Sequence, residues 1–266
     1  MPALTPAPRL VASDLDGTLV RSDGTVSPRT VAAIAAVEAA GAPFVMVTGR
    51  PSRWMHPLVE ATGHRGLAVC ANGAVLYDLH TERVVEAHLL TTDVAAEVVA
   101  SLRAAVPGIA FAVEHPERGF GHEATYVPRW EQPEPPQPVE DLVHGGVIKL
   151  LGRHEEYGSD ELLAAAREAL GDLAECTHSS DDGLLEISAV GVSKASGLAA
   201  FAASHGIDAA DVIAFGDMPN DIPMLLWAGR GVAMGNGHPE VLEVADEVTG
   251  PVDDDGVADV LERWFS

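Results

Sequence analysis

Short runs of mainly hydrophobic residues alternate with longer amphipathic stretches in the first and last parts of the chain. We predict a strand at each run, because a strand that is apolar on both faces is typical of a buried parallel sheet. Helical patterns separate the runs, which indicates βαβ units. The predicted strands are residues 9–13, 43–47, 66–70, 212–215 and 231–234.

Residues typical of helix ends bound the amphipathic stretches. Ser27 followed by Pro28 is an N-cap with a first-turn proline, and Gly41 is a typical helix stop. Gly63 ends the next predicted helix in the same way. Besides the helix between Ser27 and Gly41, we predict helices at residues 51–62 and 219–228 and a last one from about residue 256.

The middle of the chain has a different pattern, with fewer and more amphipathic strands. Strands are predicted at residues 109–113, 147–151 and 184–188, with helices at 93–106 and 160–170. A proline-rich stretch that starts at Pro128 is interpreted as a surface loop rather than a polyproline ligand. The predicted fold class is therefore α/β, with a Rossmann-like parallel-sheet core of residues 1–83 and 190–266. An α+β domain of residues 84–189 interrupts this core.

Charge excludes some classes of partner. The formal net charge is −24, from 40 acidic and 16 basic residues, which argues against binding to nucleic acid or to an anionic membrane surface. A small anion can still bind where a metal ion or a lysine reverses the local field. No apolar run approaches a membrane span, and the first residues lack signal-peptide features, so we expect a cytoplasmic protein. The sequence does not indicate an oligomeric state.

Polar residues follow directly on three of the predicted core strands. They are Asp14 and Asp16 in SDLDGT, Thr48 in TGR, and the pair Asp217 and Asp221 in GDMPND. Because ligands bind outside the carboxyl ends of strands in such sheets, these side chains should converge. Four carboxylates would repel one another without a cation, and hard oxygen donors favour Mg²⁺ over zinc.

This set of residue types suits phosphoryl transfer. A carboxylate beside a metal ion can attack phosphorus, because the metal neutralises both groups. A second carboxylate two residues further on lies on the same side of an extended chain and can transfer protons. Thr48 supplies a hydroxyl and Lys194, in GVSKASGL, a cation for the phosphate.

The four motifs together resemble those of the haloacid dehalogenase-like (HAD) phosphatases. DLDGT, TGR, Lys194 and GDMPND occur in the family's order, and the insertion resembles the C2 cap of the Cof-type branch, subfamily IIB. The likeness extends to ANG at residues 71–73, GVAMGNG at 231–237 and DDGVADVLE at 254–262. In GVAMGNG the last glycine stands where alanine is more usual, and we expect this departure to leave the chemistry untouched.

The resemblance implies a role for each motif residue. Asp14 attacks phosphorus and forms an aspartyl phosphate, and Asp16 protonates the leaving group and then activates water. Mg²⁺ is held by Asp14, the Asp16 backbone carbonyl and Asp217. Substrate or phosphate binding is implied for Thr48, Gly49, Arg50, Lys194 and Asn220, and Lys194 also restrains Asp14. Asn220 and Asp221 orient Lys194 and the metal's water shell. Gly49, Arg50 and Asn72 have the weaker claims, as residues at the rim of the site.

We therefore expect a Mg²⁺-dependent phosphatase whose cap closes over small phosphorylated metabolites, sugar phosphates above all. A phosphomutase of the same superfamily is the alternative enzyme. A non-catalytic binding protein would have lost a motif residue, and none is missing.

Three smaller interpretations depend on the fold. Arg50 can either contact substrate or pair with a surface carboxylate. Residues 253–255 are expected to form an N-cap in a solvated loop rather than a metal site. His122, in the inserted region, is interpreted as an ordinary polar histidine rather than a substrate contact.

Overall fold

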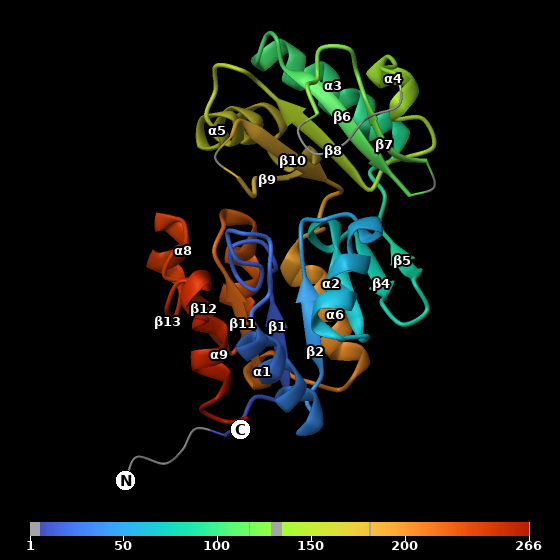
Figure 1. Cartoon of the computed structure of the whole chain (residues 1–266). Coiled ribbons are helices and arrows are strands. Elements are labelled where there is room, and N and C mark those ends of the chain that lie inside the picture. The colour runs from blue at the N-terminus through green and yellow to red at the C-terminus, as the bar shows by residue number, and fades with distance from the viewer. Residues whose placement is uncertain (1–5, 117, 129–134, 181, 266) are drawn as a thin grey trace. The chain divides into compact units, whose positions relative to one another are not determined.

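The chain forms two compact units in the computed structural model, which describes residues 6–116, 118–128, 135–180 and 182–265 (Figure 1). The first unit comprises Met1–Val85 and Lys194–Ser266, and the second comprises Glu86–Ser193. The predicted fold class is confirmed, since a mostly parallel sheet with helices occurs in one unit and a separate antiparallel sheet in the other.

The sheet of the first unit has eight strands in the order β13-β12-β11-β1-β2-β3-β4-β5. The strands from β13 to β3 are parallel, whereas β4 is antiparallel to β3. The strands are β1 (Leu10–Ser13), β2 (Phe44–Val47), β3 (Leu67–Cys70), β4 (Val75–Asp78), β5 (Arg83–Ala87), β11 (Val212–Gly216), β12 (Arg230–Ala233) and β13 (Glu247–Val248).

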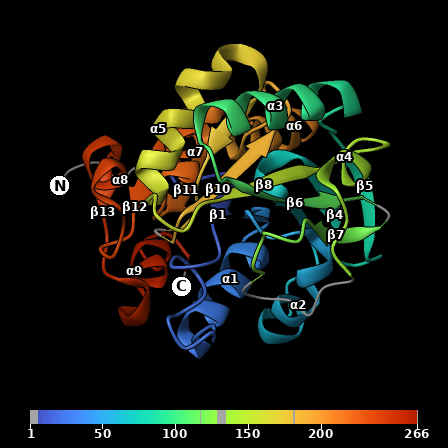
Figure 2. The same ribbon diagram turned by 90° about the horizontal axis from the view of Figure 1, so that it is seen from above.

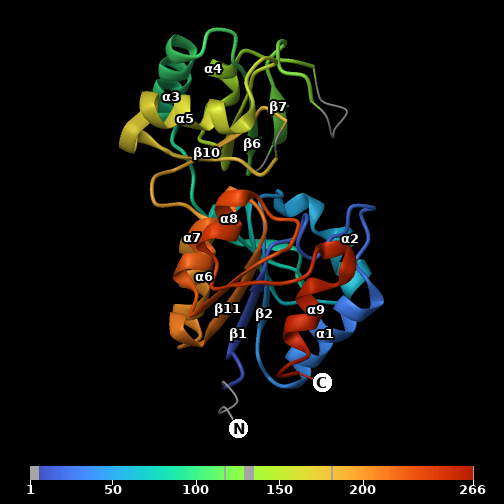
Figure 3. The same cartoon turned by 90° about the vertical axis from the view of Figure 1, so that its left-hand side faces the viewer.

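Helices cover both faces of this sheet, which explains why its central strands are apolar throughout. Figures 2 and 3 show α6 and α7 on one face and α1 and α9 on the other. Every residue of β1, β2 and β11 is buried. The helices are α1 (Pro28–Ala39), α2 (His56–Thr62), α6 (Lys194–Ser204), α7 (Ile222–Trp227), α8 (Pro239–Val244) and α9 (Gly256–Leu261).

The predicted helix ends are confirmed, but two predicted helices are interrupted. The Ser27 hydroxyl accepts from the Thr30 backbone N–H at 3.0 Å, and Gly63 ends α2 with a left-handed φ of 70°. Prolines 57 and 223 explain the interruptions, because a proline inside a helix lacks an N–H and clashes with the preceding turn. Residues 52–54 and 219–221 accordingly form separate 3-10 turns before α2 and α7.

The second unit contains a five-stranded antiparallel sheet in the order β7-β6-β8-β10-β9. Figure 3 shows α3 and α5 on one face of this sheet. The side chains of Phe111, Leu150 and Ile187 belong to a buried hydrophobic cluster that the sheet forms with these two helices. Its elements are α3 (Thr92–Ala105), β6 (Ala110–His115), β7 (Gly119–His122), α4 (Val139–Leu142), β8 (Lys149–Arg153), α5 (Ser159–Leu170), β9 (Glu175–Thr177) and β10 (Leu184–Ser188).

The two cysteines lie within strands, Cys70 at the end of β3 and Cys176 in β9. Cys70 is buried and Cys176 partly buried, and neither forms a disulfide within the described residues. The first part of the proline-rich stretch, residues 129–134, lies outside the described residues. No helix in the described ranges has the length and apolar character that crossing a membrane requires.

Candidate active site

Three neighbouring strands end at the same edge of the first unit's sheet. In the sheet register, Ser13 of β1 lies opposite Met46 of β2 and Phe215 of β11. Asp14, Thr48 and Asp217 follow these strands within one or two residues. The parallel pairing therefore brings residues more than 200 positions apart in the chain to one place, as the strand pattern predicted.

Three buried carboxylates form an acidic cluster at this edge. One carboxylate oxygen from each of Asp14, Asp217 and Asp221 lies within 4.8 Å of the other two. All three side chains are almost completely removed from solvent. A cluster of this kind requires cations, because each buried carboxylate loses its hydration and repels the others.

Lys194, the first residue of α6, supplies one positive charge. Its Nζ donates to Asp14 Oδ1 and to Asp221 Oδ1, both at 2.6 Å. Burial alone would lower the pKa of Lys194, but the charges of these two carboxylates and the hydrogen bonds to them outweigh it and raise the pKa. The ammonium is therefore permanently charged and restrains the Asp14 carboxylate.

Asp221 is occupied on both of its oxygens. In addition to Lys194, it accepts from the backbone N–H groups of Asp217 and Met218, both at 2.9 Å. Its side chain is 0% exposed. These contacts hold the lysine and the loop, and they engage both carboxylate oxygens of Asp221.

Burial raises the pKa of both Asp14 and Asp217. For Asp14, desolvation is the largest cause, the charge of Lys194 opposes it, and the neighbouring carboxylates add to the rise. Burial and the charge of Asp221 raise the pKa of Asp217 to about 7, although a hydrogen bond from Thr18 opposes the rise. The ionised forms of these two neighbouring carboxylates are therefore unfavourable, and a divalent cation bound between them would stabilise the ionised forms.

The turn after Asp16 depends on a glycine. Gly17 has a φ of 81°, and a Cβ at this position would collide with Oδ2 of Asp217. The next residue, Thr18, donates its hydroxyl to Asp217 Oδ1 at 2.9 Å. The conformation of this turn therefore decides where the Asp217 carboxylate lies.

Asn236 holds the same turn from the other side. Its Nδ2 donates to the Gly17 carbonyl at 2.9 Å, and its Oδ1 accepts from the Val252 backbone N–H at 2.8 Å. The neighbouring Gly237 lies against Asp217, since a Cβ there would meet the Asp217 carbonyl oxygen at 3.3 Å. The glycine that departs from the family pattern thus lies beside the backbone of Asp217, and its expected lack of effect on the chemistry stays a prediction.

Asp16 lies outside the acidic cluster. Its side chain is 58% exposed and forms a two-pronged ion pair with Arg50. Arg50 Nε donates to Asp16 Oδ2 at 2.7 Å, and Nη2 donates to Oδ1. The sequence left open whether Arg50 contacts substrate or pairs with a carboxylate, and the structure shows a carboxylate pair. The partner is Asp16, the residue expected to transfer protons.

The residues after β2 form a compact polar turn. Thr48 is buried, and its Oγ1 accepts from the Arg50 backbone N–H at 3.0 Å. Its carbonyl accepts from the Asn72 backbone N–H at 2.9 Å. Asn220 Nδ2 in turn donates to Asn72 Oδ1 at 3.1 Å, which joins the second and fourth motifs through two buried amides. Gly49 lies between Thr48 and Arg50 in this turn.

Two residues of the site were not singled out from the sequence. Thr18 holds the Asp217 carboxylate, and Asn236 holds the turn at Gly17. Each is part of a motif, DLDGT or GNG, that was noted as a whole. Their side-chain roles needed the position of Asp217, which sequence spacing does not provide.

The smaller sequence interpretations have mixed outcomes. The expected N-cap within residues 253–255 is wrong in detail: Asp255 precedes α9 without capping it, and its carboxylate instead accepts from Arg21 at 2.6 Å. Asp253 accepts from the backbone N–H and hydroxyl of Ser22. His122 is buried on β7, where its Nδ1 donates to the Glu123 carbonyl at 2.9 Å.

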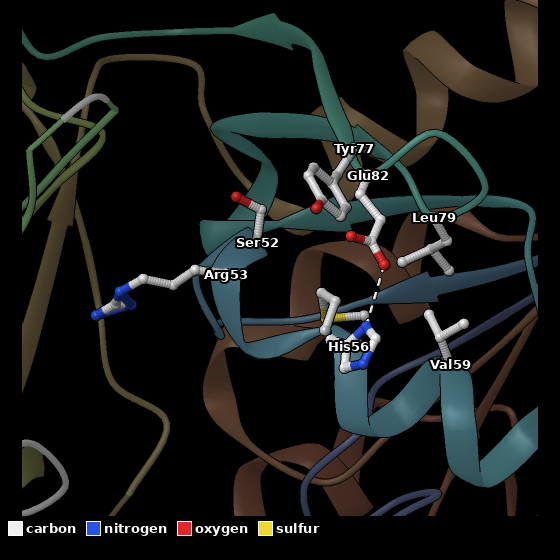
Figure 4. A pocket seen from close by; sticks show the side chains of 8 residues that line it. Ser52, Arg53, His56, Val59, Tyr77, Leu79 and Glu82 are labelled. Atoms are coloured by element: carbon white, nitrogen blue, oxygen red, sulfur yellow. Dashed lines mark hydrogen bonds and ion pairs between the residues drawn. The ribbon is translucent and has the colours of Figure 1, made fainter.

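A separate hollow lies beside β4 in the first unit. Figure 4 shows His56 and Glu82 joined across it and Arg53 pointing away, and the cavity has a volume of about 110 Å³. His56 Nδ1 and Glu82 Oε1 are 3.0 Å apart. None of the clustered carboxylates lines this cavity, which is too small for most ligands.

Comparison with known proteins identifies the family. A family model described as haloacid dehalogenase-like hydrolase matches residues 11–261. The chain is a haloacid dehalogenase-like hydrolase. Within this family it belongs to the Cof-type, subclass IIB phosphatases, and it is a hydrolase.

Two curated bacterial relatives of this HAD hydrolase match over nearly their whole lengths. The chain is 31% identical over 271 residues to the pyridoxal phosphate phosphatase YbhA of Escherichia coli, covering 95% of this chain and 97% of the relative. It is 32% identical over 256 residues to the 5-amino-6-(5-phospho-D-ribitylamino)uracil phosphatase YcsE of Bacillus subtilis, covering 96% and 95%.

Solved structures share the fold of this HAD hydrolase. The phosphatase BT1666 of Bacteroides thetaiotaomicron superposes with a TM-score of 0.82 at 25% identity, covering 98% of both chains. The subclass IIB sugar phosphatase BT4131 gives 0.80 at 22% identity over 96% and 98% of the two chains. The family model and the curated relatives confirm the predicted family and enzyme class.

Proposed function

We propose that this protein is a Mg²⁺-dependent phosphatase that hydrolyses small phosphorylated metabolites through an aspartyl phosphate on Asp14. The observation that carries the proposal is the buried Asp14 carboxylate, held on one oxygen by Lys194 and beside Asp217. The contact with Lys194 restrains this carboxylate, one oxygen of which would attack phosphorus.

The reaction would proceed in two balanced steps. One oxygen of Asp14 forms a bond to phosphorus and the ester P–O bond breaks. The leaving oxygen keeps the electron pair of that bond and receives a proton from Asp16. Water then attacks the aspartyl phosphate, gives its proton to Asp16, and the bond between phosphorus and Asp14 breaks. Asp16 is suited to both transfers, because its side chain is solvent-exposed while Asp14 is buried.

The phosphoryl group needs hydrogen-bond donors and positive charge. Lys194 supplies the charge, and the turns with Thr48, Gly49 and Asn220 follow β2 and β11, the two strands that pair with β1. Lys194 is already engaged with two carboxylates, so a second cation would be needed to balance the cluster and a dianionic ester.

The donor set fits Mg²⁺. Asp14 and Asp217 each keep an oxygen without a hydrogen bond to the described residues, and hard carboxylate oxygens suit this ion. Asp14, Asp217 and the Asp16 backbone carbonyl would hold it, with Asn220 and Asp221 outside them. A bound divalent ion would screen the incoming phosphate from the carboxylates and polarise its oxygens.

The substrate class follows from relatives and charge. The two curated relatives act on phosphate esters of small metabolites, by their names, and the net charge of −24 disfavours polyanions. Sugar phosphates are the first class to assay.

A direct assay uses phosphate release from an aryl phosphate and from a panel of phosphorylated metabolites. We expect Asp14→Asn to abolish turnover, and removal of Mg²⁺ by a chelator to do the same reversibly. Asp211→Asn is the matched control, since it removes an exposed carboxylate paired with Arg9 before β11. Full activity in Asp14→Asn, or transfer of phosphate to a second organic substrate without hydrolysis, would contradict the proposal.

A further inference from the structure

The ion pair between Arg50 and Asp16 differs from the buried pairs at the same sheet edge. Two guanidinium nitrogens face the two oxygens of one carboxylate, with Nε at 2.7 Å from Oδ2. Such two-pronged pairs constrain direction as well as distance. The Arg50 side chain is only 22% exposed, so solvent screens this pair less than an ordinary surface pair.

Arg50 projects from a fixed piece of backbone. Its N–H donates to Thr48 Oγ1 at 3.0 Å, and its carbonyl accepts from the Ala71 backbone N–H at 2.9 Å. Asp16, in contrast, has an exposed side chain in a turn. Within the described part of the chain, both hydrogen bonds to its carboxylate come from Arg50. The arginine is thus the anchored partner, and the carboxylate is the one that gains an orientation.

We propose that Arg50 is a positioning residue for Asp16, which it holds for proton transfer, and not a ligand of the substrate's phosphoryl group. This inference rests on the proposed function, in which Asp16 exchanges protons with the leaving group and with water. An exposed aspartate has several side-chain rotamers, and only some can reach the reacting oxygen. A misplacement of about 1 Å can cost on the order of a hundredfold in rate.

A kinetic cycle tests the coupling between the two residues. Wild type, Arg50→Ala, Asp16→Asn and the double variant are compared in kcat for an alkyl phosphate at saturating Mg²⁺. We expect Arg50→Ala to lower kcat by roughly 10-fold to 100-fold in the wild-type background. In the Asp16→Asn background the same change should cost less than about threefold, because the group it positions is gone.

The inhibition constant of inorganic phosphate distinguishes the two roles of Arg50. Loss of a positioning residue would leave this constant unchanged, whereas loss of a phosphoryl ligand would raise it. We expect the inhibition constant of phosphate for Arg50→Ala to stay within about twofold of wild type, since the phosphoryl ligands are intact. Arg50→Lys should fail to restore kcat, because an ammonium cannot form the two parallel bonds. Arg9→Ala removes an arginine that precedes β1 and should leave both quantities unchanged.

Additive losses in the cycle, or an inhibition constant that rises tenfold or more, would overturn the inference and assign Arg50 to the phosphoryl group. A thermal melt of Arg50→Ala separates these outcomes from misfolding, and Arg50→Lys repeats the comparison if the alanine variant unfolds. A wild-type enzyme that releases no phosphate would instead overturn the proposed function, and this inference with it.

Discussion

Both carboxylate oxygens of Asp221 are hydrogen-bonded to other groups of the protein. Asp221 accepts from Lys194 and from two backbone N–H groups while fully buried. Removing one partner from such a network leaves the others buried without compensation, which costs more than the net worth of the bonds. Side chains of this kind should matter for stability as much as for activity.

Asp221→Asn should therefore lower the free energy of unfolding by about 2–4 kcal/mol, because an amide cannot accept from all three donors. Urea denaturation followed by circular dichroism measures this. The exposed control Asp211→Asn should change it by less than about 0.5 kcal/mol. Equal effects of the two variants would show that the Asp221 contacts are not formed in solution.

The raised pKa of Asp217, about 7, makes stability depend on pH. Its pKa in the unfolded chain is lower, so the folded state binds more protons between the two values, and stability falls as pH rises through this range. In the absence of metal, the melting temperature should therefore decrease as the pH is raised from about 5 to 7. Added Mg²⁺ should then raise the melting temperature more at pH 8 than at pH 5.5, and a larger effect at the lower pH would contradict this account.

At the scale of elements, the turn that follows Asp16 requires a left-handed backbone conformation at Gly17. Gly17 and Gly24 have nearly the same φ, 81° and 82°, but a Cβ at Gly17 meets Asp217 whereas one at Gly24 meets nothing within 4 Å. Alanine at either position would place a Cβ in the left-handed backbone region, which destabilises the fold by roughly 1–2 kcal/mol. Only the substitution at Gly17 also displaces a carboxylate of the acidic cluster.

We therefore expect Gly17→Ala to lower kcat/KM at least about a hundredfold and Gly24→Ala to leave it near wild type. Steady-state kinetics with an aryl phosphate measures both, and melting temperatures account for the shared backbone strain. If Gly24→Ala lost as much activity as Gly17→Ala, strain alone and not the contact with Asp217 would explain the effect.

Elements with a buried, apolar pattern were the ones that the sequence predicted well. Strands β1, β2, β3, β11 and β12 lie within a residue or two of their predicted bounds, because each is buried on both faces. In contrast, β5 was missed, since all five of its residues are exposed and it has no apolar face. The strand predicted at residues 147–151 lies two residues later, because Val147 pairs with Leu90 before β8 begins.

The sequence predicted that several motif residues lie close together, but it predicted few of their contacts. Parallel strand order brings Asp14, Thr48 and Asp217 together, and that follows from sequence. The Arg50–Asp16 pair and the Asn236 bridge depend on side-chain directions in turns, which no spacing rule contains. The roles assigned to these residues, and the cap role of the second unit, stay predictions.

At the scale of the whole molecule, the net charge of −24 opposes the approach of a phosphate ester. Neutral salt screens this long-range repulsion, while the short-range contacts with Lys194 in the buried site are screened much less. We expect kcat/KM to rise by about twofold to fivefold between low and physiological ionic strength at constant free Mg²⁺. A fall over the same range would show that local positive charge dominates the encounter.

The central claim is that Asp14 carries the phosphoryl group. Rapid acid quench of the wild-type enzyme during turnover, followed by peptide mass spectrometry, tests it most directly. The account predicts one added phosphoryl group on the peptide that contains Asp14, labile to hydroxylamine and absent from Asp14→Asn. Steady release of phosphate with no such adduct, or an adduct on another residue, would contradict it.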